Sequence, residues 1–227
     1  MNAAVALPPA VADLLREASE WRLLGLLFEY PTKAWRENIE ALLPSLHSQE
    51  LRAIAQAALE QASEGLHIAL FGPAGTAPVR EVTYQGGVQF GYLMAELSAY
   101  YEAFGYQPQV EEAADHLAVQ LGFLSFLKLK QAHALIIGES EAASLTAEAS
   151  ANFLREHIAV QAEPVLKALE NFAPAYLAGA GKLILARAGP PPQSGFPLGS
   201  AFDAGAESEM MSCGPSAAED GLIQLQP

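Results

Sequence analysis

The stretch from Val110 to Ile137 constrains the fold of this chain more than any other segment. Its apolar residues recur at helical spacing on two faces, formed by Leu117, Leu121, Leu124, Val119, Phe123 and Phe126. A segment that is apolar on two faces is typical of a helix surrounded by other helices, and its length exceeds that of ordinary strands. The pattern therefore predicts an all-α bundle packed around a central buried helix over residues 110–137.

Four charged or acidic residues near the start of this stretch are not explained by packing. Glu111 and Glu112 are expected in the first helical turn, where carboxylates interact favourably with the helix dipole. Asp115 and His116 follow side by side. One interpretation is that this pair belongs to a solvated first turn, and the other is that it forms a functional site.

The rest of the chain alternates amphipathic segments with helix stop signals. Thr32 and Ser48 are predicted N-caps because a hydroxyl can accept a hydrogen bond from a free amide of the first turn. Leu66–Phe71 is a short apolar piece, followed by a long Gly- and Pro-rich loop of the kind that is often functional. Further helices are expected at residues 10–30, 32–43, 48–65, 88–104 and 140–160, and from Pro164 and Pro174 onward.

The composition changes at both ends of the chain. Residues 1–9 are predicted to be a loose leader that ends at a proline pair, and residues 10–188 a single helical domain. Residues 189–227 contain no Lys or Arg and are dense in Gly, Pro, Ser and Ala. Such a segment cannot bury enough apolar surface to offset its ordering entropy, so we predict a flexible acidic tail.

The charge balance and cysteine count limit the partners and the compartment. The formal net charge of −14 argues against nucleic acid, because phosphates are bound by Lys and Arg, and favours a cationic partner. Cys213 is the single cysteine, which suits a reducing compartment. Polar residues interrupt the central stretch and no charged n-region precedes an apolar segment, so we expect no membrane span, no secretion signal and a cytoplasmic location.

No catalytic constellation is apparent in the sequence. Glu64 and His67 have the Glu-x-x-His spacing of a di-metal bundle, but Gly65 interrupts the pair and no second copy exists. Phosphate-loop, dinucleotide-binding and nucleophile-elbow motifs are absent. We therefore expect no enzymatic activity, no bound metal and no cofactor.

Aromatic residues are concentrated between positions 84 and 106. The set comprises Tyr84, Phe90, Tyr92, Tyr100, Tyr101, Phe104 and Tyr106. These side chains could belong to the core with their hydroxyls reaching the surface. Alternatively, they could form the wall of a groove that grips a peptide.

Three motifs, taken in order, resemble the TorD/DmsD/NarJ family of molybdoenzyme maturation chaperones. The first is WRLLGLLFEYP at residues 21–31, and the second is LHIALFGP followed by PVREVTYQ, at residues 66–85. The third is YYEAFGYQPQVEEAADHLAVQLGFLSFL, which includes an Asp-His-Leu step at residues 115–117. In this step Ala114 replaces the family's usual proline, and Gln120 stands where the family often has Glu.

The resemblance implies an all-α, TorD/NarJ-like domain that acts as a system-specific chaperone. Its partner would be the apo catalytic subunit of a molybdopterin oxidoreductase, bound through an N-terminal signal peptide, often of the twin-arginine type. Binding would delay export until the cofactor is inserted, and the chaperone would act as a monomer or homodimer. The candidate peptide-binding residues are Asp115, His116, Gln120, Tyr84 and Tyr100.

Two other classes of protein stay open from the residues. One is a small helical enzyme or metal-binding protein that uses His116 with a further partner. The other is a permanent helical subunit of a redox complex.

Overall fold

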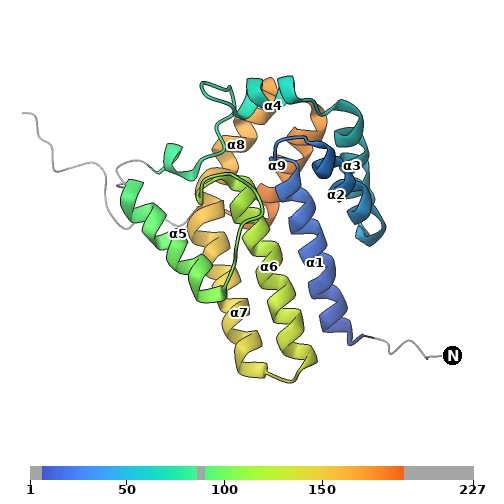
Figure 1. Ribbon diagram of the computed structural model, residues 1–227, viewed down its shortest axis with the longest axis vertical. Helices are drawn as coiled ribbons and strands as arrows, with labels where there is room; N and C mark the ends of the chain where they lie inside the picture. Colours follow the sequence, from blue (N-terminus) through green and yellow to red (C-terminus); the bar gives the residue numbers. More distant parts are fainter. Residues whose placement is uncertain (1–6, 86–89, 192–227) are drawn as a thin grey trace, which may run out of the picture. The chain divides into compact units, whose positions relative to one another are not determined.

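The computed structural model describes residues 7–85 and 90–191, which form a bundle of α-helices (Figure 1). Within these ranges the strand-like pairing is limited to one antiparallel bridge between Arg80 and His116. The α-helices are α1 (Pro9–Leu26), α2 (Lys33–Leu42), α3 (Gln49–Gln61), α4 (Glu64–Phe71), α5 (Phe90–Phe104), α6 (Leu117–Ile136), α7 (Ser140–Phe153), α8 (Ala159–Phe172) and α9 (Ala175–Ala188). The all-α prediction is confirmed, whereas most of the predicted tail, from residue 192 on, lies outside the described residues.

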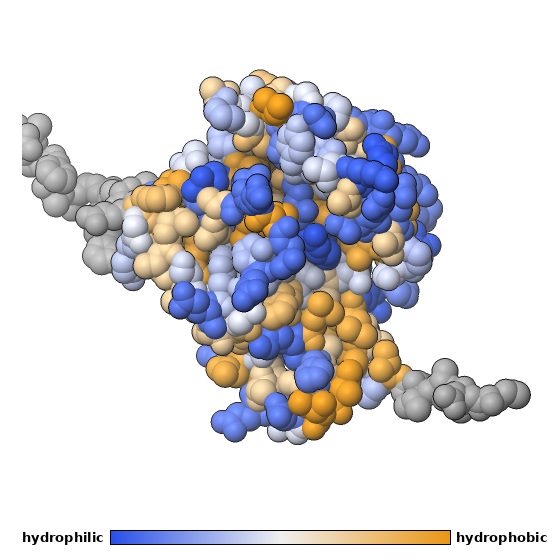
Figure 2. Space-filling model, viewed as in Figure 1, coloured by the Kyte–Doolittle hydropathy of each residue, from blue (hydrophilic) through white to orange (hydrophobic). Residues whose placement is uncertain are grey.

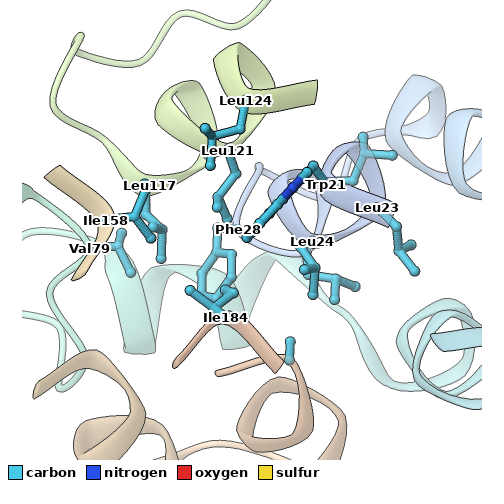
Figure 3. Close-up of a cluster of buried hydrophobic side chains, with 14 of the residues drawn as sticks. Trp21, Leu23, Leu24, Phe28, Val79, Leu117, Leu121, Leu124, Ile158 and Ile184 are labelled. Atoms are coloured by element: carbon cyan, nitrogen blue, oxygen red, sulfur yellow. The ribbon is translucent and has the colours of Figure 1, made fainter. Parts of the chain in front are cut away.

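Helix α6 is the central buried helix that the sequence predicts. It runs beside α1 on one side and α7 on the other (Figure 1). Leu117, Leu121 and Leu124 project from α6 into a buried cluster that also contains Phe28, Val79, Ile158 and Ile184 (Figure 3). Full burial of one such side chain contributes about 1.5–3 kcal/mol, so this row contributes several kcal/mol to the stability of the bundle.

Helices α1 and α6 approach each other closely because a glycine stands at their contact. A Cβ built at Gly25 would lie 3.2 Å from the carbonyl oxygen of Ala118. Farther along the same contact, the Ser125 hydroxyl donates a buried hydrogen bond to the carbonyl of Ala18 at 2.8 Å. The absent side chain and this hydrogen bond together fix the register of the two helices.

The start of the central helix differs from the prediction. Helix α6 begins at Leu117, seven residues after the expected Val110, and Glu111 and Glu112 lie in the preceding loop. His116 occupies the N-cap with extended backbone, and its Nδ1 accepts a hydrogen bond from the amide of Ala118. The carboxylates expected in the first turn are therefore not there, because a histidine side chain caps the helix instead.

The two predicted N-caps are confirmed. The Thr32 hydroxyl accepts a hydrogen bond from the amide of Trp35, and the Ser48 hydroxyl accepts one from that of Leu51. The apolar piece that follows α3 is itself a helix, α4, which is capped by the hydroxyl of Ser63. Helix α1 ends at Leu26, four residues before the expected Tyr30.

The expected break before Pro164 does not occur. A π-helical turn over Leu154–Ile158 connects α7 directly to α8, and Pro164 lies inside α8. Val165 and Leu169 of α8 are fully or almost fully buried. Packing of this apolar face has overridden the helix-breaking tendency of proline.

The aromatic cluster belongs largely to the core. Phe123 of α6 is fully buried and lies within ring-contact distance of Tyr101, Tyr106 and Phe153, with centroid separations of 4.9, 5.3 and 4.8 Å. Edge-to-face contacts of this kind stabilise aromatic cores beyond the area they bury. Phe90 and Tyr92, at the start of α5, are instead more than half exposed.

Candidate functional site

The segment from Val79 to Tyr84 lies against the start of α6 and positions the predicted Asp-His pair. The amide of Leu117 donates to the carbonyl of Val79, and the amide of Glu81 donates to that of Asp115, both at 2.9 Å. A short 3₁₀ turn, η2 (Glu81–Thr83), follows. These contacts hold Arg80 and Glu81 directly over residues 115–120.

Asp115 is fully buried and is already paired with an arginine of the same chain. Its Oδ1 accepts a hydrogen bond from Arg80 Nε at 2.5 Å, and its Oδ2 accepts one from the amide of Val82 at 3.3 Å. The Arg80 side chain keeps 37% of its surface exposed, whereas that of Asp115 has none. The carboxylate predicted to receive a peptide is thus enclosed and already paired in the free chain.

His116 is a buried, neutral cap. Burial lowers its pKa to about 4, and the nearby His67 and Arg80 lower it in the same direction. The ring is therefore uncharged at pH 7, and its Nδ1 is the acceptor for the Ala118 amide. This tautomer carries its proton on Nε2, which lies 3.9 Å from a carboxylate oxygen of Glu112.

Gln120 belongs to a buried polar network that the sequence did not indicate. It donates to Glu81 Oε2 and accepts from Gln161, while Nδ1 of His157 lies 3.1 and 3.2 Å from the two Glu81 oxygens. All four side chains are essentially inaccessible to solvent. His157 Nε2 and Gln161 Oε1 have no hydrogen-bond partner among the described residues. Gln120 therefore joins η2, the π-helical turn and α8, away from the surface.

Tyr84 and Tyr100 are partly buried against the core, on different parts of the bundle. The Tyr84 hydroxyl donates to the carbonyl of Pro78, and burial raises its pKa. The Tyr100 hydroxyl donates to Glu156 at 3.2 Å, and burial, followed by the charge of Glu156, raises its pKa to about 12. Both phenols act here as hydrogen-bond donors that fasten loops and helices.

Two adjoining hollows form a two-part groove along the loop of residues 105–112, one against α1 and α6 and the other against α2 and the segment that joins α1 to α2. We call its halves the apolar hollow, of about 450 Å³, and the acidic hollow, of about 520 Å³. The apolar hollow is lined mainly by Tyr106, Val110, Ala118, Gly122, Phe126 and Leu129. The acidic hollow is lined mainly by Tyr30, Thr32, Asn38, Glu111 and Glu112. The two halves meet at Arg22, Glu29, Gln109 and Val110, which line both.

The apolar hollow continues into exposed apolar surface. Leu129 is 46% exposed, and Ile136 and Ile137 at the end of α6 are more than half exposed. Phe126, Leu129, His133 and Ile136 recur at helical spacing on one face of α6. Apolar side chains gather over the lower ends of α1 and α6, below a more hydrophilic area (Figure 2).

A second arginine–carboxylate pair stands where the two hollows meet. Arg22 Nη1 lies 2.5 Å from Glu29 Oε1, and the Glu29 side chain is only 9% exposed. Glu112 lines the acidic hollow together with Arg22 and Glu29. Burial raises the pKa of Glu112, the charge of Arg80 lowers it and that of Glu29 raises it. None of Arg22, Glu29 and Arg80 was predicted as a site residue. All three nevertheless lie in the first two motifs that resemble the family, at residues 21–31 and 66–85.

Among residues 7–85 and 90–191, no group of three or more His, Cys, Asp or Glu side chains is placed to hold a metal ion. In the same part of the chain no helix combines the length and apolar character needed to cross a bilayer. Cys213 lies outside the described residues.

Comparison with known protein families gives one match. Residues 31–164, which are more than half of the chain, match the family described as nitrate reductase delta subunit. The comparison with curated proteins gave no match. The matched region contains Arg80, Glu81, the Asp-His pair, all of α6 and the whole of the groove-lining loop. The chain therefore belongs to the nitrate reductase delta subunit family, whose members are chaperones for the maturation of molybdoenzymes.

Proposed function

We propose that this chaperone binds the N-terminal signal peptide of an apo molybdopterin oxidoreductase in the two-part groove. The observation that carries the proposal is the junction of an acidic hollow with an apolar one at Glu29 and Val110. A twin-arginine signal has the complementary order, a basic pair followed by an apolar stretch. Its basic part fits beside Glu111 and Glu112, and its apolar part fits along Phe126 and Leu129.

Charge supports this assignment of partner. The chain carries a formal net charge of −14, which attracts a basic leader over long range and accelerates encounter. Because such steering is screened by salt, the association rate is expected to fall as ionic strength rises. Affinity contributed by the apolar hollow is expected to depend on salt much less.

The five predicted peptide-binding residues take different parts in the proposal. Asp115 binds Arg80 beside η2, and His116 caps the start of α6. Gln120 donates a hydrogen bond to Glu81 of η2. None of these three, nor Tyr84 or Tyr100, lines either hollow. Direct contact of Tyr84 or Tyr100 with a peptide stays a prediction.

The cellular role follows from the family and the proposed ligand. The chaperone holds the apo catalytic subunit in the cytoplasm, and so delays export until the molybdenum cofactor is inserted. It needs no catalytic group or cofactor of its own for this task. It acts as a monomer or homodimer.

The test is a fluorescence titration of the full chain with a synthetic peptide of about 25 residues. The peptide carries an Arg-Arg pair followed by an apolar stretch. We expect Glu111→Gln with Glu112→Gln, and separately Leu129→Asp, to weaken binding by tenfold or more. Glu148→Gln, an exposed carboxylate on α7 that lines neither hollow, is the matched control. Equal affinity of all four proteins would remove the peptide from the groove.

A second candidate function is that of a permanent subunit, which the family description "delta subunit" favours. The two roles differ in what they bind after maturation. A maturation chaperone co-purifies with the precursor that still carries its signal, and not with the mature enzyme. Stoichiometric recovery with the mature enzyme would decide for the permanent subunit.

A further inference from the structure

We propose that Arg22 and Arg80 occupy, in the free chaperone, the places of two arginines of the client's leader, and that the leader binds by displacing them. This inference rests on the proposed function. It identifies Glu29 and Asp115 as the two carboxylates that receive the leader's guanidinium groups. Asp115 then belongs to the binding site when the leader is bound, whereas Arg80 is its partner in the free chaperone.

The two pairs share one construction. In each, the carboxylate is almost fully enclosed, at 9% exposure for Glu29 and none for Asp115. In each, the arginine keeps about a third of its surface in solvent, at 33% for Arg22 and 37% for Arg80. Each contact is made through one nitrogen at 2.5 Å. In each pair a partly exposed arginine thus neutralises a carboxylate that is itself enclosed.

Both pairs lie near one carboxylate of the acidic hollow, Glu112, although Arg80 and Asp115 do not themselves line the hollow. Glu29 lines this hollow together with Glu112. Glu112 in turn lies 3.9 Å from His116, the residue that follows Asp115, and its pKa is affected by the charges of Arg80 and Glu29. Two guanidinium groups on adjacent residues of one peptide could therefore approach both carboxylates from this hollow.

The pair of Arg187 and Glu20 is a comparison for the two arginine–carboxylate pairs of the groove. Arg187 lies 2.6 Å from Glu20, but its guanidinium also stacks over the ring of Trp21 at 5.2 Å from the ring centroid. The pair faces a different hollow, formed by α1, α6, α7 and α9. Arg187 is thus held by two contacts, away from the two-part groove, and it provides a matched control.

The need for a stand-in follows from electrostatics. Loss of its cation by a buried carboxylate strongly destabilises the fold. Buried carboxylates that bind a cationic ligand must therefore be paired with another cation in the free protein. Exchange of one guanidinium for another keeps each carboxylate paired before and after binding. The exchange also favours arginine over lysine in the leader, because a guanidinium presents a planar fork of donors that an ammonium lacks.

The experiment compares three peptides with three forms of the full chain at low salt. The peptides are identical apart from an Arg-Arg, Lys-Lys or Gln-Gln pair before the apolar stretch. The proteins are wild type, the double variant Arg22→Gln with Arg80→Gln, and Arg187→Gln. Removal of the internal competitors is expected to tighten binding of the Arg-Arg peptide by tenfold or more. Arg187→Gln and the Gln-Gln peptide are expected to show no such gain.

The outcomes separate the inference from the function on which it rests. A wild-type chain that binds none of the peptides would overturn the proposed function and the inference together. A wild-type chain that binds the Arg-Arg peptide, with no gain in the folded double variant, would overturn the displacement alone. If the double variant does not fold, Arg22→Lys with Arg80→Lys keeps both carboxylates paired. A smaller gain is then expected, and equal or weaker binding would again contradict displacement.

Discussion

The hydroxyl of Tyr106 lies directly over Gly122, so close that a Cβ at position 122 would stand 2.5 Å from the hydroxyl oxygen. The same hydroxyl donates a hydrogen bond to the carbonyl of Val119 at 3.2 Å. Tyr106 belongs to the loop that forms one wall of the apolar hollow, and Gly122 belongs to the α6 wall. The missing side chain on α6 therefore determines how closely the loop can pack.

Substitution of Gly122 by alanine is expected to open this contact. The added methyl group pushes the Tyr106 ring outward and breaks its hydrogen bond to Val119, at a cost of about 1 kcal/mol. Part of this loss is offset, because alanine favours the helix over glycine by up to ~1 kcal/mol. Stability should then change little, while affinity for the Arg-Arg peptide falls. Gly91→Ala on α5, where no atom lies within 4 Å of the new Cβ, is the control and should leave affinity unchanged.

Asp115→Ala is expected to destabilise the fold by about 2–3 kcal/mol. The change leaves Arg80 and the amide of Val82 without their acceptor, and the partial exposure of Arg80 keeps the loss below that of a fully buried pair. Urea denaturation provides the measurement. Asp13→Ala removes the exposed pair with Arg16 and should change stability by under about 1 kcal/mol. Equal effects of the two variants would contradict the structural role of Asp115.

His116 makes stability depend on pH. Its pKa is lowered from 6.5 to about 4 in the folded state, so the unfolded chain binds its proton more readily. The stabilisation is complete above pH 6.5 and is lost progressively as the pH falls toward 4, by at most about 3 kcal/mol. Glu112, whose pKa is raised by burial, works in the opposite sense and reduces the net slope.

His116→Asn isolates this contribution, because asparagine can cap α6 without titrating. Denaturation midpoints measured from pH 7 to pH 4 should fall less steeply in this variant than in wild type. His47→Asn, at an exposed site, should reproduce the wild-type slope. An unchanged slope in His116→Asn would show that His116 is not the titrating group.

Glu81→Gln is expected to cost about 2–3 kcal/mol despite its nearly identical shape. The Glu81 carboxylate accepts from Gln85 and Gln120 and lies beside His157. An amide at this position offers one acceptor oxygen and brings two donors into a space already filled with donors. Thermal denaturation at pH 7 measures the loss, and Glu60→Gln on the exposed side of α3 is the comparison. A midpoint equal to that of the comparison variant would show that the network is not needed for stability.

The two hydroxyl caps were predicted correctly from local signals, whereas contacts between distant residues were not predicted. Thr32 and Ser48 were identified as caps because each bonds within its own first helical turn. The start of α6 was misplaced because it is determined by a segment 35 residues upstream, through Arg80, Val79 and Glu81. Nothing in the spacing of residues 110–117 reports that contact.

The sequence predicted the position of the candidate site residues along the chain, but not their burial. The sequence placed Asp115 and His116 together at the start of the central helix, which is close to their position. It could not show that Asp115 is enclosed by Arg80, or that Gln120 is covered by His157 and Gln161, because burial depends on how η2 and α8 pack. Hydrophobic periodicity reports which face of a helix is buried, but it does not identify the polar residues buried with that face.

The π-helical turn between α7 and α8 has a consequence for tolerance to insertions and deletions. A helix advances about 100° per residue, so the extra residue in the turn sets the rotation of everything that follows it. Deletion of one residue from Leu154–Ile158 would rotate α8 by that angle and carry Gln161, Val165 and Leu169 away from the core. The number of residues between α7 and α8 therefore has to stay the same. A substitution in the turn keeps the rotation of α8, whereas an insertion or deletion changes it.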